Sequence, residues 1–223
     1  MEMDRPRING SGSQRKYATD LLKRFHMMGC KTTATPKNTN EKLLLNDGTE
    51  EANVQQYRSL VGGLIYLTHT RPDISYSVGV ISRFMHTPTK HHYGAAKRIL
   101  RYVAGTRDFG IWYKQVKQCN LVGYTDSDWE GCMEDRRSTA GYAFYFGSGV
   151  ISWSSKQQAT VALSSSEAEF IAATATPCQG ICLTRILEDL GQKQREETQI
   201  FCDNKATIAM TKNPVFHGRT ILI

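Results

Sequence analysis

The sequence predicts an α/β fold in which a small helical segment precedes a mixed sheet with helices. Two observations lead to this prediction. Apolar residues recur at helical spacing through most of residues 14–108, whereas short, alternating, aromatic-rich runs follow residue 108. A last strand is reached through helices, so it should lie parallel to an earlier strand, while the hairpins before it are antiparallel. The sheet should therefore contain both strand orientations.

The first half of the chain should be helical. Residues 1–13 are rich in Arg, Pro, Gly and Ser and predict a disordered tail, and the polar stretch 30–55 predicts a long linker. Gly29 is expected to end the first helix and Gly105 the last, while Pro72 suits the start of an intervening helix. The apolar faces of these helices are carried by Tyr17, Leu21, Phe25, Met28, Tyr57, Leu60, Val61, Leu64, Ile65, Ile74, Val78, Ile81, Met85, Ala95, Ala96, Ile99, Leu100 and Val103.

Four runs with strand character follow. Residues 109–113 and 119–125 predict strands, and Gly147-Ser148-Gly149 predicts a tight hairpin between strands 139–146 and 150–154. A further short strand or an extended connection should occupy residues 156–163.

Helices and one more strand should complete this half. Ser164 and Glu167 have the S-x-x-E spacing of a capping box, so a helix should begin there. Pro177 is expected to interrupt it, with a second helix running to Gly191. Residues 198–202 predict a short strand, and Asp203 is a candidate N-cap for a last helix.

The charge of +7 is unevenly distributed along the chain. Residues 1–118 contain 19 Lys or Arg against 9 Asp or Glu, whereas residues 119–223 contain 9 against 12. This asymmetry suggests a basic surface for a polyanion beside a cation site, although both could simply be solvated faces. In the basic half, Lys97 and Arg101 on the last predicted helix could face phosphates, and a solvated helix face is the alternative.

Three carboxylates occupy positions from which they could meet. Asp126 follows an apolar strand, with Asp128 two residues later, and a turn would explain both acids equally well. Glu169 lies on the small-residue face of the helix predicted to begin at Ser164. A helix N-terminus also favours a solvated Glu, which is the alternative. Asp203 should emerge beside Asp126 if their strands are parallel neighbours. Clustered carboxylates repel one another unless divalent cations neutralise them, and oxygen ligands of this kind suit Mg²⁺ or Mn²⁺. Two such ions can support phosphodiester cleavage.

The order of elements and acids resembles ribonuclease H, and the chain as a whole resembles the Pol polyprotein of copia-type LTR retrotransposons. The resemblance covers residues from about Gln14 to Arg219. It is carried by these blocks: Tyr57-Arg58-Ser59-Leu60-Val61-Gly62-Gly63-Leu64-Ile65-Tyr66-Leu67, Thr70-Arg71-Pro72-Asp73-Ile74, Lys97-Arg98-Ile99-Leu100-Arg101-Tyr102, Asp126-Ser127-Asp128-Trp129, Arg137-Ser138-Thr139-Ala140-Gly141-Tyr142, Ser152-Trp153-Ser154-Ser155-Lys156, Ser164-Ser165-Ser166-Glu167-Ala168-Glu169, Cys202-Asp203-Asn204-Lys205, Asn213-Pro214 and His217-Gly218-Arg219.

The resemblance implies a division of labour along the chain. Residues 14–118 would correspond to the reverse transcriptase thumb and connection segment, and residues 119–223 to an incomplete ribonuclease H-like domain. It implies metal-dependent hydrolysis of RNA in an RNA–DNA hybrid, with Asp126, Glu169 and Asp203 as catalytic metal ligands and Asp128 in a supporting position. Ser127, Ser165 and Asn204 stand beside these acids and would contact the nucleic acid. Other Pol-derived segments are further expected partners.

Departures from the family pattern limit the expected activity. The polymerase Asp-Asp site is absent, so no DNA synthesis is expected. The family continues beyond residue 219 with a helix, a strand and a helix bearing a fourth Asp, and here the sequence turns to Thr220-Ile221-Leu222-Ile223. We therefore expect a C-terminally truncated domain with weak or lost nuclease activity. The alternative is a non-catalytic nucleic-acid-binding fragment.

The remaining features concern the cellular environment. The N-terminus lacks a secretory signal, and the six scattered cysteines form no C-x-x-C pair. Cys178 and Cys182 are four residues apart on a predicted helix, and buried thiols are expected there rather than half of a metal site. No apolar run is expected to span a bilayer. These features predict an intracellular protein, cytoplasmic or nuclear, without membrane contact.

Overall fold

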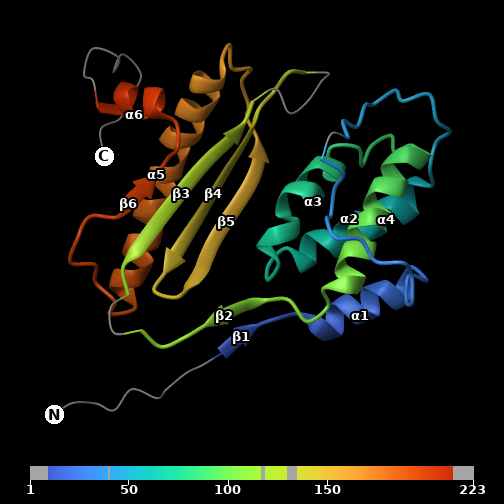
Figure 1. The fold of residues 1–223 in the computed structure, drawn as a ribbon, viewed down its shortest axis with the longest axis horizontal. Helices are drawn as coiled ribbons and strands as arrows, with labels where there is room; N and C mark the ends of the chain where they lie inside the picture. The colour runs from blue at the N-terminus through green and yellow to red at the C-terminus, as the bar shows by residue number, and fades with distance from the viewer. Residues whose placement is uncertain (1–9, 40, 117–118, 130–134, 213–223) are drawn as a thin grey trace. The chain divides into compact units, whose positions relative to one another are not determined.

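The computed structural model describes residues 10–39, 41–116, 119–129 and 135–212, and the chain divides into two compact units. Within the described residues, Ser11–Ile111 form a helical unit and the residues from Trp112 onward form a sheet unit (Figure 1). The predicted domain boundary after residue 118 stays a prediction. The sequence blocks at 213–214 and 217–219 lie outside the described residues.

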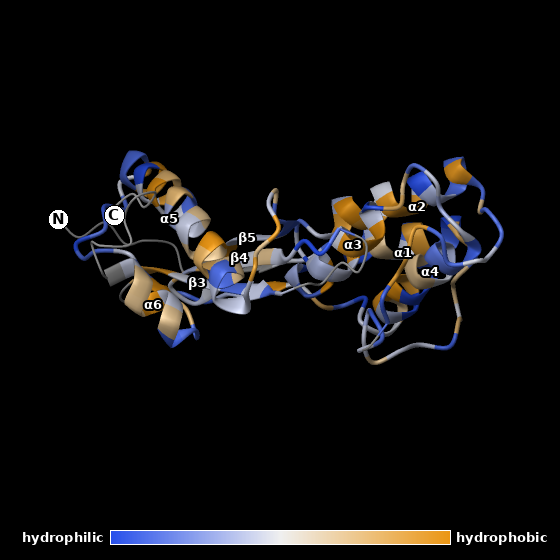
Figure 2. Ribbon diagram, turned by 90° about the horizontal axis from the view of Figure 1, so that it is seen from above, coloured by the Kyte–Doolittle hydropathy of each residue, from blue (hydrophilic) through white to orange (hydrophobic). Residues whose placement is uncertain are grey.

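The helical unit is built around one apolar core. It contains α1 (Arg15–Arg24), α2 (Val54–Leu67), the 3₁₀ turn η1 (Pro72–Ile74), α3 (Ser75–Ser82) and α4 (Lys90–Gly105). Most residues on the predicted faces are buried together, and Figure 2 shows hydrophobic residues along α1, α2 and α3. Met28 and Ile65 are exposed, and α1 ends at Arg24, so the prediction is wrong for these two positions and for a first helix ending at Gly29. Fully or almost fully buried members of this core are Leu21, Leu22, Tyr57, Leu60, Val61, Leu64, Leu67, Ile74, Ala96, Ile99, Leu100 and Val103.

The described residues between α1 and α2 form no helix or strand beyond one isolated bridge between Glu51 and Thr89, as expected, but this stretch is not a free linker. His92 of α4 contacts the Leu44 carbonyl at 2.9 Å through Nε2, and Thr89 donates to Asp47 at 2.6 Å. Arg101 donates to the Lys31 carbonyl at 2.6 Å. Polar side chains of α4 therefore hold this stretch against the helical unit, which a polar composition alone could not reveal.

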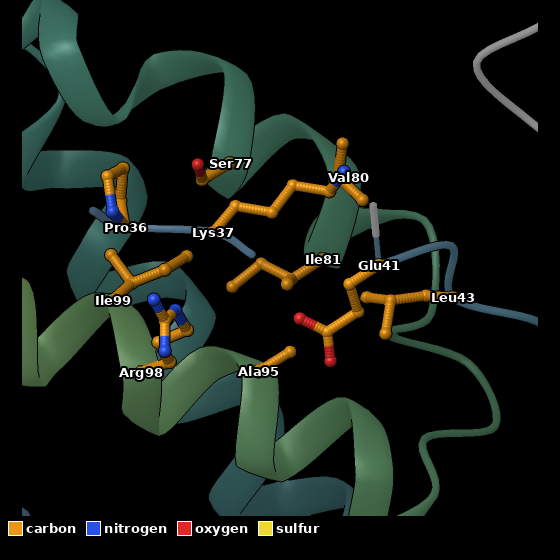
Figure 3. Close-up of a pocket in the computed structure, with 10 residues that line it drawn as sticks. All are labelled: Pro36, Lys37, Glu41, Leu43, Ser77, Val80, Ile81, Ala95, Arg98 and Ile99. Atoms are coloured by element: carbon orange, nitrogen blue, oxygen red, sulfur yellow. The ribbon is translucent and has the colours of Figure 1, made fainter. Parts of the chain in front are cut away.

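A small cavity of about 10 Å³ remains where this stretch meets α3 and α4 (Figure 3). Figure 3 shows Arg98 of α4 beside Ile99, with Lys37 and Glu41 contributed by the stretch. The Arg98 guanidinium donates to Thr35 at 3.0 Å, while its buried Nε has no hydrogen-bond partner among the described residues. A cavity of this size has room for about one water molecule, so it offers no ligand site.

The sheet unit contains the predicted mixed sheet. Its strand order is β5 (Gly149–Gln157), β4 (Thr139–Phe146), β3 (Leu121–Asp128) and β6 (Gln199–Phe201). The β5–β4 and β4–β3 pairs are antiparallel and the β3–β6 pair is parallel, which confirms the predicted combination of orientations. Two shorter strands, β1 (Gly10–Gly12) and β2 (Ile111–Tyr113), pair with each other, so the predicted tail includes a strand at its end.

The core of the sheet unit depends on close approach at one glycine. Phe144 of β4 is fully buried with Leu121 of β3 and with Leu187, which belongs to the long helix α5 (Ser165–Asp189). A Cβ at Gly123 would lie 2.7 Å from the Phe144 ring, which is too close for two carbons. Gly123 therefore leaves room on β3 for the aromatic ring that joins the sheet to α5.

One continuous helix, α5 (Ser165–Asp189), runs along a face of the sheet, and the predicted interruption at Pro177 is wrong (Figure 1). Proline removes one backbone hydrogen bond in a helix interior, but packing on the sheet can outweigh that loss. Thr176, directly before it, is buried and donates to Thr125 of β3 at 3.0 Å. The neighbouring turns of α5 are thereby fixed to the sheet on the N-terminal side of the proline.

The composition of α5 also corrects the expectation about membranes. Among the described helices, α5 alone has the length and apolar composition to cross a bilayer, a test that core helices also meet. The buried residues of α5 are Ala168, Glu169, Ala172, Thr176, Gly180 and Leu187.

Cys178 and Cys182 are exposed, so the prediction of buried thiols at these two positions is wrong.

The caps of the last two helices differ from prediction in detail. Ser164 accepts from the Glu167 N–H as predicted, but the Glu167 carboxylate accepts from the N–H of Leu163 instead of that of Ser164. In α6 (Lys205–Lys212), Asn204 caps the helix by accepting from the N–H groups of Ala206 and Thr207. The capping role proposed for the preceding aspartate is therefore filled by Asn204.

Candidate metal centre

Asp126 and Asp203 lie just beyond the same point of two paired parallel strands. Tyr124 of β3 is paired with Phe201 of β6, and each aspartate follows two residues later. Both aspartates are exposed. This is the arrangement expected from the sequence, and it depends on the parallel pairing of a three-residue edge strand.

Glu169 comes to the same place from the first turns of α5. It is 7% exposed, and its Oε1 accepts a hydrogen bond from the Ser127 N–H at 3.0 Å. Its helix is anchored to β3 through the Thr176–Thr125 contact, and the small residues Ala168 and Ala172 allow close packing on the sheet. The glutamate is therefore held by both its backbone position and a main-chain donor from β3.

The electrostatics of Glu169 are those of a crowded carboxylate. Burial raises its pKa, and so do the nearby charges of Asp126 and Asp203, while the hydrogen bond from the Ser127 N–H acts in the opposite direction. Among the described residues, no Lys, Arg or His forms a salt bridge with these three acids.

Sequence reasoning missed Cys202, which lies within the same group. Its Sγ donates to Glu169 Oε2 at 3.9 Å, and the ligand atoms of Glu169, Cys202 and Asp203 all lie within 4.8 Å of one another. Burial raises the pKa of the Cys202 thiol, although a hydrogen bond with the Asn204 backbone opposes the shift. The only sequence signal for Cys202 was its position next to Asp203.

Gln158 is a second residue that the sequence did not single out. It is 5% exposed and donates from Nε2 to the Ala168 carbonyl at 2.8 Å and to the Ser127 hydroxyl at 3.3 Å. It therefore connects the end of β3 with the start of α5. Its Oε1 is buried without a hydrogen-bond partner among the described residues.

The residues predicted to contact nucleic acid have mixed placements. Ser165 is exposed at the first position of α5, and Ser127 is half-buried with its hydroxyl bonded to Gln158. Asn204 is half-buried and uses its side chain to cap α6. Asp128 is exposed at the end of β3.

Lys97 and Arg101 belong to α4 in the helical unit. The Lys97 ammonium lies 4.7 Å from the centre of the Tyr93 ring, and the Arg101 guanidinium is bonded to the Lys31 carbonyl. Both side chains are half-buried and have partners within the helical unit, and a contact with phosphates stays a prediction.

The donor set suits a hard divalent cation. Carboxylate oxygens of Glu169 and Asp203 lie within 4.8 Å of each other; Asp126 is outside this close group, although its charge acts on Glu169. Such oxygens are the preferred ligands of Mg²⁺ and Mn²⁺. A bound cation would relieve the repulsion among the acids. The oxygen donors of Glu169 and Asp203 are therefore of the kind and spacing that such an ion takes, and the role of Asp126 as a further ligand stays a prediction.

Comparison with known proteins places this sequence among transposon proteins. It is 46% identical over 209 residues to the "Retrovirus-related Pol polyprotein from transposon RE2" of Arabidopsis thaliana, covering 93% of this chain and 14% of that protein. It is 42% identical over 215 residues to the corresponding polyprotein from transposon TNT 1-94 of Nicotiana tabacum, covering 93% and 16%. A shorter relative, the "Uncharacterized mitochondrial protein AtMg00810" of Arabidopsis thaliana, is 42% identical over 170 residues, or 75% of this chain and 69% of that protein.

Neither a protein-family profile nor a solved structure matches the chain. The chain spans only 14–16% of the length of the two polyproteins, so it corresponds to one portion of them. That portion aligns over nearly all of the chain, through the helical unit and the sheet unit alike. The chain is therefore homologous to one portion of copia-type retrotransposon Pol polyproteins.

Proposed function

We propose that the sheet unit is a ribonuclease H-type nuclease domain that hydrolyses RNA in RNA–DNA hybrids, with activity that is weak or lost. The observation that carries this proposal is that the charges of Asp126 and Asp203 both act on Glu169, while none of the three acids has a salt-bridge partner among the described residues. The mixed strand order and the homology to Pol polyproteins support it.

Each acid has a distinct role in this proposal. Asp126 and Asp203 provide exposed oxygens at the strand ends, where a phosphodiester can approach, while the buried Glu169 holds its carboxylate in place through the Ser127 N–H. Mg²⁺ or Mn²⁺ bound by these oxygens supplies an activated water and stabilises the leaving oxygen. Gln158 positions both Ser127 and the start of α5, and it thereby fixes the separation between Asp126 and Glu169.

Recognition of the hybrid would come from polar groups beside the acids. Ser165 is exposed at the N-terminus of α5, where backbone N–H groups also favour phosphate. We assign it the nearest contact to the nucleic-acid backbone, because the side chains of Ser127 and Asn204 already have partners within the protein.

The test is Mg²⁺- or Mn²⁺-dependent cleavage of a labelled RNA–DNA hybrid. We expect Asp126→Asn, Glu169→Gln and Asp203→Asn each to lower the rate at least about 100-fold, because each removes charge needed for the metal. Asp189→Asn, an exposed acid at the far end of α5, is the matched control and should leave the rate unchanged. Cleavage that survives Asp126→Asn would refute the proposal.

A second measurement covers the case of undetectable cleavage. The midpoint temperature of thermal unfolding should rise when Mg²⁺ or Mn²⁺ is added to the natural chain, because a ligand that binds the folded state stabilises it. In Glu169→Gln this temperature should not change. Hybrid binding that needs neither metal nor Glu169, with no cleavage under any condition, would instead establish the non-catalytic binding function.

A further inference from the structure

One side chain distinguishes this group from a set of carboxylates alone. The thiol of Cys202 follows β6 and lies 3.9 Å from Glu169 Oε2, within a cluster whose three ligand atoms are no more than 4.8 Å apart. The cluster draws on two separate elements, since Glu169 comes from α5, and Cys202 and Asp203 from the end of β6. A cation bound here would join the start of the helix to the edge of the sheet.

The chemistry of a thiol and two carboxylates selects a particular class of ion. Thiolates bind Zn²⁺ and other thiophilic ions and contribute little to Mg²⁺, which takes oxygen ligands. Ligands of a tetrahedral zinc ion stand about 3.3–3.8 Å apart, given zinc–ligand bonds of about 2.0–2.3 Å. The present spacing therefore needs only a small closure of the three side chains.

We propose that Cys202, Glu169 and Asp203 form a site for a thiophilic divalent cation of the Zn²⁺ class. On binding, the thiol proton is released to solvent and a sulfur–metal bond replaces the hydrogen bond to Glu169. Only 7% of Glu169 is exposed to solvent, and no salt bridge within the described residues offsets its charge. A divalent ion provides that compensation, and water or Asp126 can complete its coordination.

This site would regulate the proposed nuclease. Glu169 and Asp203 serve both sites, so a zinc-class ion bound through Cys202 excludes the Mg²⁺ arrangement. That consequence rests on the proposed function, whereas the binding of the ion does not.

The test uses Cd²⁺ as a spectroscopic probe on the full chain. Exposed Cys178 and Cys182 could bind the probe themselves, so both are first replaced by Ser. In this double variant, titration should produce the ultraviolet thiolate-to-cadmium charge-transfer band with one equivalent of Cd²⁺, and Zn²⁺ should remove it. Adding Cys202→Ser should abolish the band, and adding Glu169→Gln should weaken Cd²⁺ binding by at least about tenfold, or about 1.4 kcal/mol.

Two results would overturn the proposal. One is a band that persists when Cys202 is replaced, and the other is a band that disappears with Cys178 and Cys182 alone. Circular dichroism of each variant establishes that the fold is retained, and Cys119→Ser provides a matched control at another half-buried thiol. Because the assay involves no cleavage, a chain without nuclease activity can still pass it, and an active nuclease can still fail it.

Discussion

At the scale of single residues, Arg71 of the Arg71-Pro72-Asp73 segment makes contacts that the sequence alone does not indicate. Its guanidinium is 2% exposed, forms two bonds to the Asp73 carboxylate at 2.7 and 2.8 Å, and donates to the Thr106 carbonyl and hydroxyl. It also lies 5.6 and 5.5 Å from the centres of the Tyr102 and Phe109 rings. The Arg71-Pro72-Asp73 segment therefore joins the turn before α3 to the end of α4, in addition to placing Pro72 at the start of a helical turn.

Removing the charge of Asp73 should destabilise the helical unit. Asp73→Asn leaves the Arg71 guanidinium buried without a counter-charge, and we expect a loss of about 2–3 kcal/mol in the free energy of unfolding, reduced from the fully buried case because Asp73 is about one-third exposed. Urea unfolding at pH 7 measures it. The exposed Arg15–Asp108 pair provides the control, and Asp108→Asn should change stability by less than about 0.5 kcal/mol.

The same pair predicts a pH dependence. Burial acts to raise the pKa of Asp73, but the hydrogen bonds and charge of Arg71 outweigh it and lower the pKa below its ordinary value. The unfolded chain thus binds a proton at Asp73 more readily than the folded chain does. The contribution of the Asp73 carboxylate to the free energy of unfolding is therefore complete above about pH 4, and it disappears as the pH falls through the pKa of Asp73 in the folded state. The difference between Asp73→Asn and the natural chain should accordingly shrink in acid, and a constant difference down to pH 2 would contradict this account.

The candidate site could be predicted only in part at this scale. Asp126, Glu169 and Asp203 each stand at the end of a strand or the start of a helix, so their positions followed from recognisable local patterns. Gln158 and Cys202 could not be found this way. Their importance comes from contacts to residues 10 to 33 positions away along the chain, and neither has a local pattern that fixes those partners.

At the scale of elements, the strand pattern was predictable and the course of α5 was not. Alternating aromatic residues and the Gly147-Ser148-Gly149 turn are local signals, and the β4–β5 hairpin forms as expected. Pro177 is also a local signal, but it competes with contacts made elsewhere. The helix continues through it to Leu187, which is buried in the sheet core.

Two adjacent glycines of α2 provide a matched test of packing against helix propensity. A Cβ on Gly62 meets no atom within 4 Å, so Gly62→Ala should stabilise the helical unit by about 0.5–1 kcal/mol. A Cβ on Gly63 would collide with the buried side chain of Leu21, and Gly63→Ala should destabilise it by about 1–3 kcal/mol. Thermal unfolding compares the two variants. If both substitutions shift the unfolding temperature in the same direction, α2 packs differently from this description.

At the scale of the whole chain, the two units differ in how much core they bury. The helical unit has a large cluster of buried apolar residues, whereas the described sheet core has Leu121, Phe144 and Leu187 as its buried members. The stability of each unit should follow from its own cluster, and the sheet unit should unfold at the lower temperature.

Two variants can assign the unfolding transitions to the units. Leu64→Ala and Phe144→Ala each remove a fully buried side chain, at an expected cost of about 2–5 and about 3–5 kcal/mol respectively. We expect Leu64→Ala to lower mainly the upper transition in calorimetry, and Phe144→Ala mainly the lower one. A single transition that both variants shift equally would show that the units unfold together.

The brevity of β6 has a consequence for how tightly any cation is held. This strand is joined to β3 through only three residue pairs, and short edge strands are among the first parts of a protein to open. Cys202 and Asp203 directly follow it, so they can act with Glu169 only while β6 is docked. The apparent affinity for the proposed cation should thus be lowered by the fraction of undocked strand, and amide hydrogen exchange in Gln199–Phe201 should slow if the ion binds.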